Sequence, residues 1–566
     1  MIRYKGSLII ILIFSLIFIF FPLEAETVKT PAEESNYKQY SQHEQITNFL
    51  SRLDHLSPNL VVKIIGCTKE REEYPAKDLF LCIISEERAD FPQKLNRSKP
   101  TFFLIASQHG NEQSAKEAAL WFIRDLAAGK LKGLLKKMNF LIIPQANPYG
   151  NWFNQRRNEQ DLDLNRDHVK LEAPESEAIH HVFRNWMPEL TMDVHEKGDS
   201  YYHLSIGCVS NPNISHTLQE FSRHTILAEV EKDLIEEDIA FHEYLITQRM
   251  GIDSSAGVRY RSEDLPNKEM MKRFSTTDLN DGRNSLGIYE SLSFIQEGAS
   301  RHDIQTLKER TRWQYLGIRF FSESVARHGR EIIAMVRSLR ENVLKKAQIY
   351  SEQDKIHLRM KYVRDENQPF LVIKKFEQAE TPIIGTLKAD KKAGEPLTRE
   401  DVAPYAYPSE YKVVEEVVRN WFPDVEPVIS VSRPLGYVIP SAHQQVVETL
   451  LRHDIKVDVF TQDSLLEVEL YKIKDIVPAE YDYLPPQMID LEKAAVQTII
   501  KKGDFYIPCF QEGANLIPCL LEPQSQYGLI RYQKFDLVPY AGDIFPFYRW
   551  IKGKELPVIP YKRWAR

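Results

Sequence analysis

The chain has 566 residues, too many for one ordinary hydrophobic core, which predicts two or three domains. Its formal net charge is -7 and no block of like charge occurs, so it lacks the basic footprint of a nucleic-acid-binding protein. Hydrophobic residues make up 43% and charged residues 27%, as in ordinary soluble globular proteins.

The N-terminal end of the chain differs from the rest. Arg3 and Lys5 precede an apolar run over 8–21, and Leu23-Glu24-Ala25 then offers a site for signal peptidase. The run is shorter than the roughly 20 apolar residues that a spanning helix needs. We predict a signal peptide over residues 1–25 and export to the periplasm or the extracellular space. A retained membrane anchor is the alternative.

Apolar runs and amphipathic segments alternate in the first half of the chain. We expect strands at 61–66, 79–85 and 190–194, a buried strand that runs into a loop over 101–110, and a buried strand over 139–148 that Pro148 stops. Helices are expected at 114–128 and 175–186. Such alternation predicts an α/β domain with a mixed, mostly parallel sheet flanked by helices. Further on, residues 214–250 are predicted to be helical. A late strand at 291–300 is followed by a long helix with Ile332 and Val336 on one face.

A second, smaller domain is predicted after this helix. The polar stretch 388–408, rich in Pro, indicates a boundary or a surface excursion. Beyond it, strands at 437–439 and 457–460 flank a helix at 444–453. We expect a catalytic domain over 40–345 and a smaller mixed α/β domain over 346–566, whose role the sequence leaves open as a structural cap or a peptide-binding flank.

The five cysteines follow no metal-binding spacing. Their number is odd and no CxxC occurs, so neither a disulfide framework nor a cysteine zinc site is indicated. Cys67 with Cys82, or Cys509 with Cys519, could form a local bridge. Five small buried hydrophobic residues are the alternative.

Two segments offer metal ligands at strand ends, where ligands bind in open α/β sheets. His109 and Glu112 stand three residues apart where the strand that begins at Thr101 runs into a loop, and His195 ends the strand at 190–194. Together they form a His₂Glu set that leaves a fourth position for water, as in catalytic zinc sites. Taken singly, HxxE is a common polar-loop sequence, and a lone histidine is more often an ordinary buried or surface residue.

A third segment, NPYGNWFNQRRNEQDLDLNRD over 147–167, is rich in arginine. It contains Arg156, Arg157, Asn165 and Arg166. The guanidinium fork can bind a substrate carboxylate in bidentate fashion. A solvated charged loop would explain the same composition.

The fourth segment is the late strand with its carboxylates. Glu297 lies near the strand's end, whereas Glu290 precedes the strand. A carboxylate beside a metal can take a proton from water and pass it to a leaving amine. We favour Glu297 over Glu290 for this role.

In this order the four segments resemble the zinc carboxypeptidase family of the carboxypeptidase A type. The family pattern is an HxxE pair, an NPDG…R…DLNRD run, a strand-borne His and a late Glu. The similarity covers roughly residues 40–340, and the C-terminal part is similar to tails on some bacterial members. The resemblance implies a zinc-dependent metallocarboxypeptidase that hydrolyses the C-terminal peptide bond of peptides or proteins, with one Zn²⁺ per chain.

Carried over residue by residue, the resemblance implies a role for each segment. His109, Glu112 and His195 would bind zinc. Arg156 would polarise the scissile carbonyl, with Arg157 as the neighbour that could be confused with it. The resemblance also assigns Asn165 and Arg166 to the substrate's terminal carboxylate, and Glu297 to general acid and base catalysis.

The chain departs from the family pattern at two points. Tyr149 stands where the family has an acid, and the family's substrate-capping tyrosine has no secure counterpart. Tyr260 and Tyr289 are candidates, but neither lies at the expected distance from Glu297.

Two other functions remain open at this point. One is a zinc amidohydrolase that acts on N-acyl amino acids or cell-wall peptides with the same ligands. The other is a non-catalytic peptide-binding protein, against which the ligands together with Glu297 speak. Serine-hydrolase GxSxG and phosphate-binding GxxxxGK[ST] motifs are both absent. We expect a peptide or protein C-terminus as the partner, with neither nucleic acid nor, after signal cleavage, a membrane.

Overall fold

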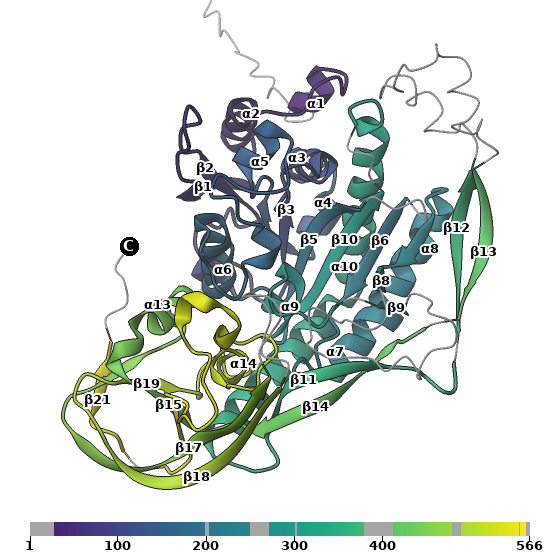
Figure 1. Cartoon of the computed structure of the whole chain (residues 1–566). Helices are drawn as coiled ribbons and strands as arrows, with labels where there is room; N and C mark the ends of the chain where they lie inside the picture. Colours follow the sequence, from purple (N-terminus) through teal and green to yellow (C-terminus); the bar gives the residue numbers. More distant parts are fainter. Residues whose placement is uncertain are drawn as a thin grey trace, which may run out of the picture.

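A computed structural model describes residues 28–197, 203–248, 271–274, 276–299, 303–368, 370–378, 411–419, 421–477, 488–553 and 555–561 (Figure 1). The predicted signal peptide, the polar stretch 388–408 and Tyr260 lie outside these residues. Within the described part of the chain, no helix is both long and apolar enough to cross a membrane.

An eight-stranded sheet forms the centre of the first half of the chain. Its strands, in spatial order, are β1 (Leu60–Cys67), β2 (Asp78–Ile84), β4 (Asn139–Ile143), β3 (Thr101–Ala106), β5 (Leu190–Lys197), β10 (Leu292–Ala299), β6 (Leu204–Cys208) and β7 (Phe241–Glu243). The four central strands, β4 to β10, run parallel, while β1, β2 and β6 pair antiparallel. The predicted mixed, mostly parallel sheet is therefore confirmed.

Helices flank this sheet and bury its apolar runs. They are α1 (Pro31–Glu34), α2 (His43–Leu56), α3 (Gln113–Ala127), α4 (Lys132–Leu135), α5 (Pro148–Phe153), α6 (Pro174–Trp186), α7 (His216–Phe221), α8 (Ala228–Glu236), α9 (Gly282–Gly287) and α10 (Leu307–Gln348). The long helix α10 packs along α3 and against β10. Every residue of β3 and β4 is buried, as expected for parallel strands that are covered on both faces.

The prediction of a continuous helix over 214–250 is wrong at its C-terminal end. The helix ends at Glu236, and Asp238 adopts a left-handed backbone with φ 57°. The chain then forms β7, which extends the sheet beside β6, and β8 (Leu245–Gln248), which pairs with β9 (Met271–Phe274). Pairing with a sheet edge that is distant in sequence overrides the helical pattern of the preceding residues.

The second half of the chain forms a separate sheet. Two ribbons, β11 (Lys355–Val363) with β14 (Asp424–Ser432) and β12 (Leu371–Gln378) with β13 (Tyr411–Val418), precede it. The sheet comprises β15 (Gly436–Ile439), β16 (Asp458–Phe460), β17 (Ser464–Val477), β18 (Met488–Ile500), β19 (Phe505–Pro508), β20 (Tyr548–Trp550) and β21 (Val558–Pro560). Two helices accompany it, α13 (Gln444–Arg452) and α14 (Leu516–Leu521).

All strand pairs of this second sheet are antiparallel, so its strands and helices do not alternate as in the first sheet. The predicted strands near 437 and 457 and the helix near 444 are present. The long hairpin β17–β18 is not among the predicted elements. Because α10 ends at Gln348, the proposed division between residues 345 and 346 falls within its last turn, and this division stays a prediction.

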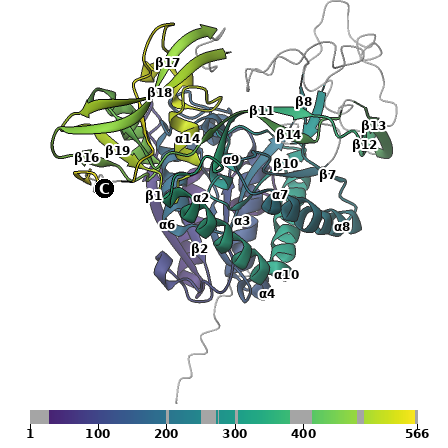
Figure 2. The same cartoon turned by 90° about the horizontal axis from the view of Figure 1, so that it is seen from below.

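The C-terminal part packs against the first unit through the segments around α13 and α14 (Figure 2). Asn515 Nδ2 donates to the carbonyl of Asn213, and His453 Nε2 lies 2.9 Å from the carbonyl of Val169. The two parts share one continuous buried apolar cluster. The C-terminal part is thus placed where it can contribute to a site in the first unit.

All five cysteines are free, so neither local disulfide considered from the sequence is present. Four of them are buried, as small apolar residues would be. Cys67, at the end of β1, is exposed.

Candidate active site

The three predicted metal ligands meet at the carboxyl ends of two neighbouring parallel strands. His109 follows β3, Glu112 precedes the first residue of α3, and His195 lies on β5. β3 and β5 pair in register up to Ala106 and Val194, so their ends coincide. A Cβ at Gly110 would lie 2.0 Å from the backbone of Gly150, so only glycine allows the turn between His109 and Glu112.

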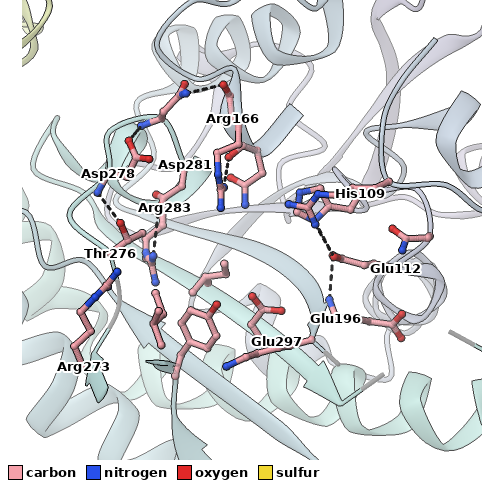
Figure 3. Close-up of a pocket in the computed structure, with 18 of the residues that line it drawn as sticks. His109, Glu112, Arg166, Glu196, Arg273, Thr276, Asp278, Asp281, Arg283 and Glu297 are labelled. Atoms are coloured by element: carbon pink, nitrogen blue, oxygen red, sulfur yellow. Dashed lines mark hydrogen bonds and ion pairs between the residues drawn. The ribbon is translucent and has the colours of Figure 1, made fainter. Parts of the chain in front are cut away.

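The ligand atoms of these residues converge on one point, and Figure 3 shows His109 and Glu112 at the cavity wall. His109 Nδ1 lies 2.8 Å from Glu112 Oε1, His195 Nδ1 lies 2.8 Å from Glu112 Oε2, and the two Nδ1 atoms are 3.1 Å apart. All three side chains are buried, and their ligand atoms lie within 4.8 Å of one another. His109 and His195 therefore lie close enough to bind one cation together.

Each histidine contacts a carboxylate through its other ring nitrogen. His109 Nε2 lies 3.1 Å from Asp163 Oδ1, and His195 Nε2 lies 2.6 Å from Asp193 Oδ2. A ring that donates from Nε2 keeps its lone pair on Nδ1, which suits metal ligation. Two such nitrogens and one carboxylate facing each other fit a divalent cation such as zinc. Sequence reasoning missed Asp163 and Asp193, although each lies in a segment that it had singled out.

The charges around this site shift its carboxylates toward the ionised form. Burial alone would raise the pKa of Glu112, but His109 and His195 lower it far below its usual range. Burial likewise acts to raise the pKa of Asp163, and the hydrogen bond from His109 and the charge of Arg156 hold it far below normal. Both carboxylates therefore remain acceptors at neutral pH.

Asp163→Asn is expected to weaken zinc binding by about 10–100-fold, because the neutral amide no longer orients and polarises His109. Zinc affinity, measured by competition with a chelating dye, checks this directly. Asp161→Asn is the matched control, since Asp161 is exposed and pairs only with Arg157. Equal zinc affinity of the wild type and Asp163→Asn would show that Asp163 does not support the site.

Arg156 and Arg157 are adjacent in the sequence but have different surroundings in the structure. Arg156 Nη1 lies 3.1 Å from His109 Nδ1, and its Nε donates to Asp163 Oδ2 at 2.8 Å. Arg157 instead donates to the carbonyl of Asp161 and is absent from the cavity wall. Arg156 is thus the arginine that stands beside the converging ligands.

Asn165 and Arg166 lie on the short 3₁₀ turn Leu164–Arg166, next to the same cavity. Asn165 Oδ1 accepts from the amide of Gly282 at 2.7 Å, and its Nδ2 lies 3.1 Å from His195 Nε2. Arg166 is accessible from the cavity. Burial acts to lower the pKa of Arg166, but Asp278, Asp163 and Asp281 raise it, so its guanidinium stays charged.

Glu297 and Glu290, the two candidate bases, lie in different places. Glu297 is buried on β10 directly beside His195 of β5 and lines the cavity. Burial raises its pKa, against the lowering effect of His195. Glu290 accepts hydrogen bonds from the amide of Ser215 and from Asn515 Nδ2 and lines another cavity. Of the two candidate bases, it is therefore Glu297 that adjoins the ligand triad.

Tyr149 and Tyr289, the two tyrosines of the sequence analysis that the structure describes, do not line the cavity. Tyr289 is buried against Phe183 and Arg184. Tyr149 packs with Tyr74 and Phe153 in an aromatic cluster. Tyr149, which stands where the family has an acid, therefore contributes to the packing of α5 in this chain.

The cavity has a volume of about 830 Å³ and includes residues that sequence reasoning missed. They come from three separate regions of the chain: Tyr244 and Ile246, then Arg273, Thr276, Asp278, Asn280, Asp281 and Arg283, and finally Arg531 and Tyr532 of the C-terminal part. The polar run TTDLNDGRN at 276–284, just before a buried strand, was a usable signal. Nothing in the local sequence marks Arg531 and Tyr532.

A model of the zinc carboxypeptidase family matches residues 46–198, a range that contains all three ligands, Arg156, Asn165 and Arg166. Over these residues the chain is similar to the zinc carboxypeptidases. The match confirms the resemblance for the three segments that it contains. Glu297 and the C-terminal part lie beyond the matched range.

Carboxypeptidases of other organisms are similar to most of the chain. Carboxypeptidase 2 of Trichophyton rubrum is 23% identical over 465 residues, which cover 79% of this chain and 76% of the relative. Carboxypeptidase 2 of Trichophyton equinum is 23% identical over 499 residues, covering 82% and 81%. Among solved structures, a metallo-carboxypeptidase from Burkholderia cenocepacia is similar at a TM-score of 0.38 and 17% identity, over 51% of this chain and 70% of the other.

Proposed function

We propose that this chain hydrolyses the C-terminal peptide bond of peptides or proteins, with one zinc ion held by His109, Glu112 and His195. The observation that carries the proposal is that His109, Glu112, Glu297 and Arg166 border one cavity, while His195 converges with the first two. Zinc acts as a Lewis acid that lowers the pKa of water and polarises a carbonyl group.

The chain's own residues supply the proton transfer and the charge stabilisation. Glu297 takes a proton from the attacking water and delivers it to the nitrogen of the leaving amino acid. Arg156, whose guanidinium lies beside His109, donates hydrogen bonds to the carbonyl oxygen as negative charge develops there. Both groups are fixed by the fold before the substrate arrives, so little reorganisation is needed.

Arg166 and Asn165 restrict the reaction to the end of a chain. A terminal carboxylate bound to Arg166 places the last amide bond near the metal ligands. Asn165 adds an amide on the same turn and is held in place by the backbone of Gly282. An internal peptide bond lacks this carboxylate and is therefore disfavoured.

Amidation of a peptide's C-terminus is expected to reduce kcat/KM at least about tenfold, because the charge-assisted hydrogen bonds to Arg166 are lost. Arg166→Ala should cause a similar loss on the free acid and little further loss on the amide. Steady-state rates on paired free and amidated peptides measure both effects. Arg157→Ala serves as the control, because Arg157 lies outside the cavity.

Equal cleavage of free and amidated peptides by the wild type would contradict the role of Arg166. A zinc amidohydrolase that acts on N-acyl amino acids or cell-wall peptides would then replace the carboxypeptidase as the proposed function. Absence of hydrolysis of either substrate class by zinc-loaded protein would favour a peptide-binding protein.

We also propose that the protein is exported. The support is the basic start, apolar run and small-residue site within residues 1–25. N-terminal sequencing of the protein recovered from the medium or periplasm tests this. A new N-terminus near residue 26 is expected, whereas an intact Met1 in a membrane fraction would indicate the retained anchor.

A further inference from the structure

A buried arginine on the cavity wall has donors that the protein does not use. Arg283, the second residue of α9, is 1% exposed. Its Nη2 donates to Asp281 Oδ2 at 2.9 Å, while Nε and Nη1 have no hydrogen-bond partner within the described part of the chain. Buried charged donors are normally satisfied, because an open one costs free energy. Since Arg283 also lines the cavity, a bound ligand is the natural source of the missing acceptor.

Residues just before Arg283 are hydrogen-bonded to Asn165 and Arg166, which we propose bind the terminal carboxylate of the substrate. The amide of Gly282 donates to Asn165 Oδ1 at 2.7 Å, and Asn280 Nδ2 donates to the carbonyl of Arg166 at 2.6 Å. Arg166 and Arg283 therefore border the same part of the cavity, as Figure 3 shows. Two substrate groups that are close together could engage them at the same time.

The opposite side of Arg283 faces β6, the neighbour of the strand that carries Glu297. A Cβ placed on Gly207 would lie 3.3 Å from Arg283 Nη1, so this guanidinium nitrogen lies against β6. Gly207 pairs with Ile295, which precedes Glu297 by two residues and lines the cavity as Glu297 does. Arg283 thus marks the end of the cavity beyond Glu297. When the terminal carboxylate is on Arg166 and the last amide is at the ligand triad, the side chain of the last residue points to this end.

The charge of the cavity favours an anionic group there. Seven of the lining side chains are basic and five are acidic. The carboxylate of Asp281 binds Arg283 with one oxygen only. Its other oxygen, Oδ1, caps α9 by accepting from the amide of Asn284 at 2.8 Å. A cavity with excess positive charge attracts anionic substrates and raises their local concentration.

We infer that the enzyme prefers a C-terminal residue with a carboxylate side chain, and that Arg283 is the residue that recognises it. The α-carboxylate would bind Arg166 and the side-chain carboxylate Arg283. This inference rests on the proposed carboxypeptidase function and names its substrate class as peptides that end in Glu or Asp.

The decisive experiment uses the zinc-loaded wild type and N-blocked dipeptides that differ only in the last residue: Glu, Gln, Leu or Lys. The Glu substrate is expected to exceed its isostere Gln by about tenfold or more in kcat/KM, because only Glu gives Arg283 a charged acceptor. Equal or faster release of Gln, Leu or Lys would overturn the inference while leaving the carboxypeptidase function intact. Failure to release any of the four would refute the function itself.

Arg283→Gln is expected to bring the Glu-to-Gln ratio down to about one, chiefly through a higher KM for the Glu substrate. Arg312→Gln, which changes an exposed arginine paired with Glu237, is the control and should keep the wild-type ratio. A ratio that stays high in a folded Arg283→Gln protein would assign recognition to another cation. If this variant does not fold, inhibition of the wild type by free glutamate compared with glutamine decides, and equal inhibition counts against the inference.

Discussion

Glu297→Gln is expected to lower kcat by about 10²–10⁴-fold while zinc remains bound, because the amide cannot take or deliver a proton. The side chain lies beside His195 on the neighbouring parallel strand and borders the cavity, but it is not one of the three converging ligands. Metal analysis of the purified variant and single-turnover kinetics on a free peptide separate loss of chemistry from loss of metal.

Glu290→Gln is the matched control for this experiment. Glu290 is also a buried glutamate with a raised pKa, near 7, caused mainly by burial. Its carboxylate is occupied by the amide of Ser215 and by Asn515, and it lies in another cavity. We expect activity close to wild type. Wild-type rates in Glu297→Gln would show that another group is the base.

Removal of the metal is expected to reduce activity on the order of 10³-fold or more, because the Lewis acid contributes several kcal/mol to the barrier reduction. His195→Ala should have the same effect, since only His109 and Glu112 remain as ligands. Dialysis of the wild type against a chelator, followed by zinc readdition, tests the first statement without any change of sequence. Activity and zinc content should return together.

The same experiment predicts a change in thermal stability. Zinc at about 1,000 times its Kd stabilises the folded chain by about 4 kcal/mol if the unfolded chain does not bind it. Tm should therefore fall on chelation and recover with zinc. His181→Ala is the control for His195→Ala, because His181 is exposed on α6 and outside the cavity. Full activity of chelated protein with no detectable zinc would refute the metal-dependent mechanism.

Local sequence patterns were sufficient for six of the eight strands of the central sheet and for the metal-ligand set. The apolar runs of β3 and β4 are short, continuous and buried, so hydrophobicity and length indicate strands there. His109 and His195 follow or end such strands, and parallel strands that are neighbours bring their carboxyl ends together. The pairing of ligands was therefore predictable once a parallel sheet was assumed.

The prediction of a helix over 214–250 is wrong at residues 241–248 for a different reason. The charged, amphipathic residues of α8 continue without a strong breaker, so the helix has no clear end in the sequence. The strand that follows exists because the edge of β6 accepts it. Edge pairing depends on a surface assembled from other parts of the chain, which no window of local sequence contains.

The sequence by itself was enough to predict the ligand set, the arginine-rich segment and Glu297, because each of these residues lies in a short segment near a strand end. Only the tertiary structure decided that Asp163 and Asp193 contact the ligating histidines, that Arg156 rather than Arg157 faces them, and that Arg283 lines the cavity. Arg531 and Tyr532 reach the same cavity from more than 200 residues beyond Glu297, because the C-terminal part shares one buried apolar cluster with the first unit. Local propensity acts over a few residues, whereas burial in a shared core joins distant segments, and the wall of this cavity is built by the latter.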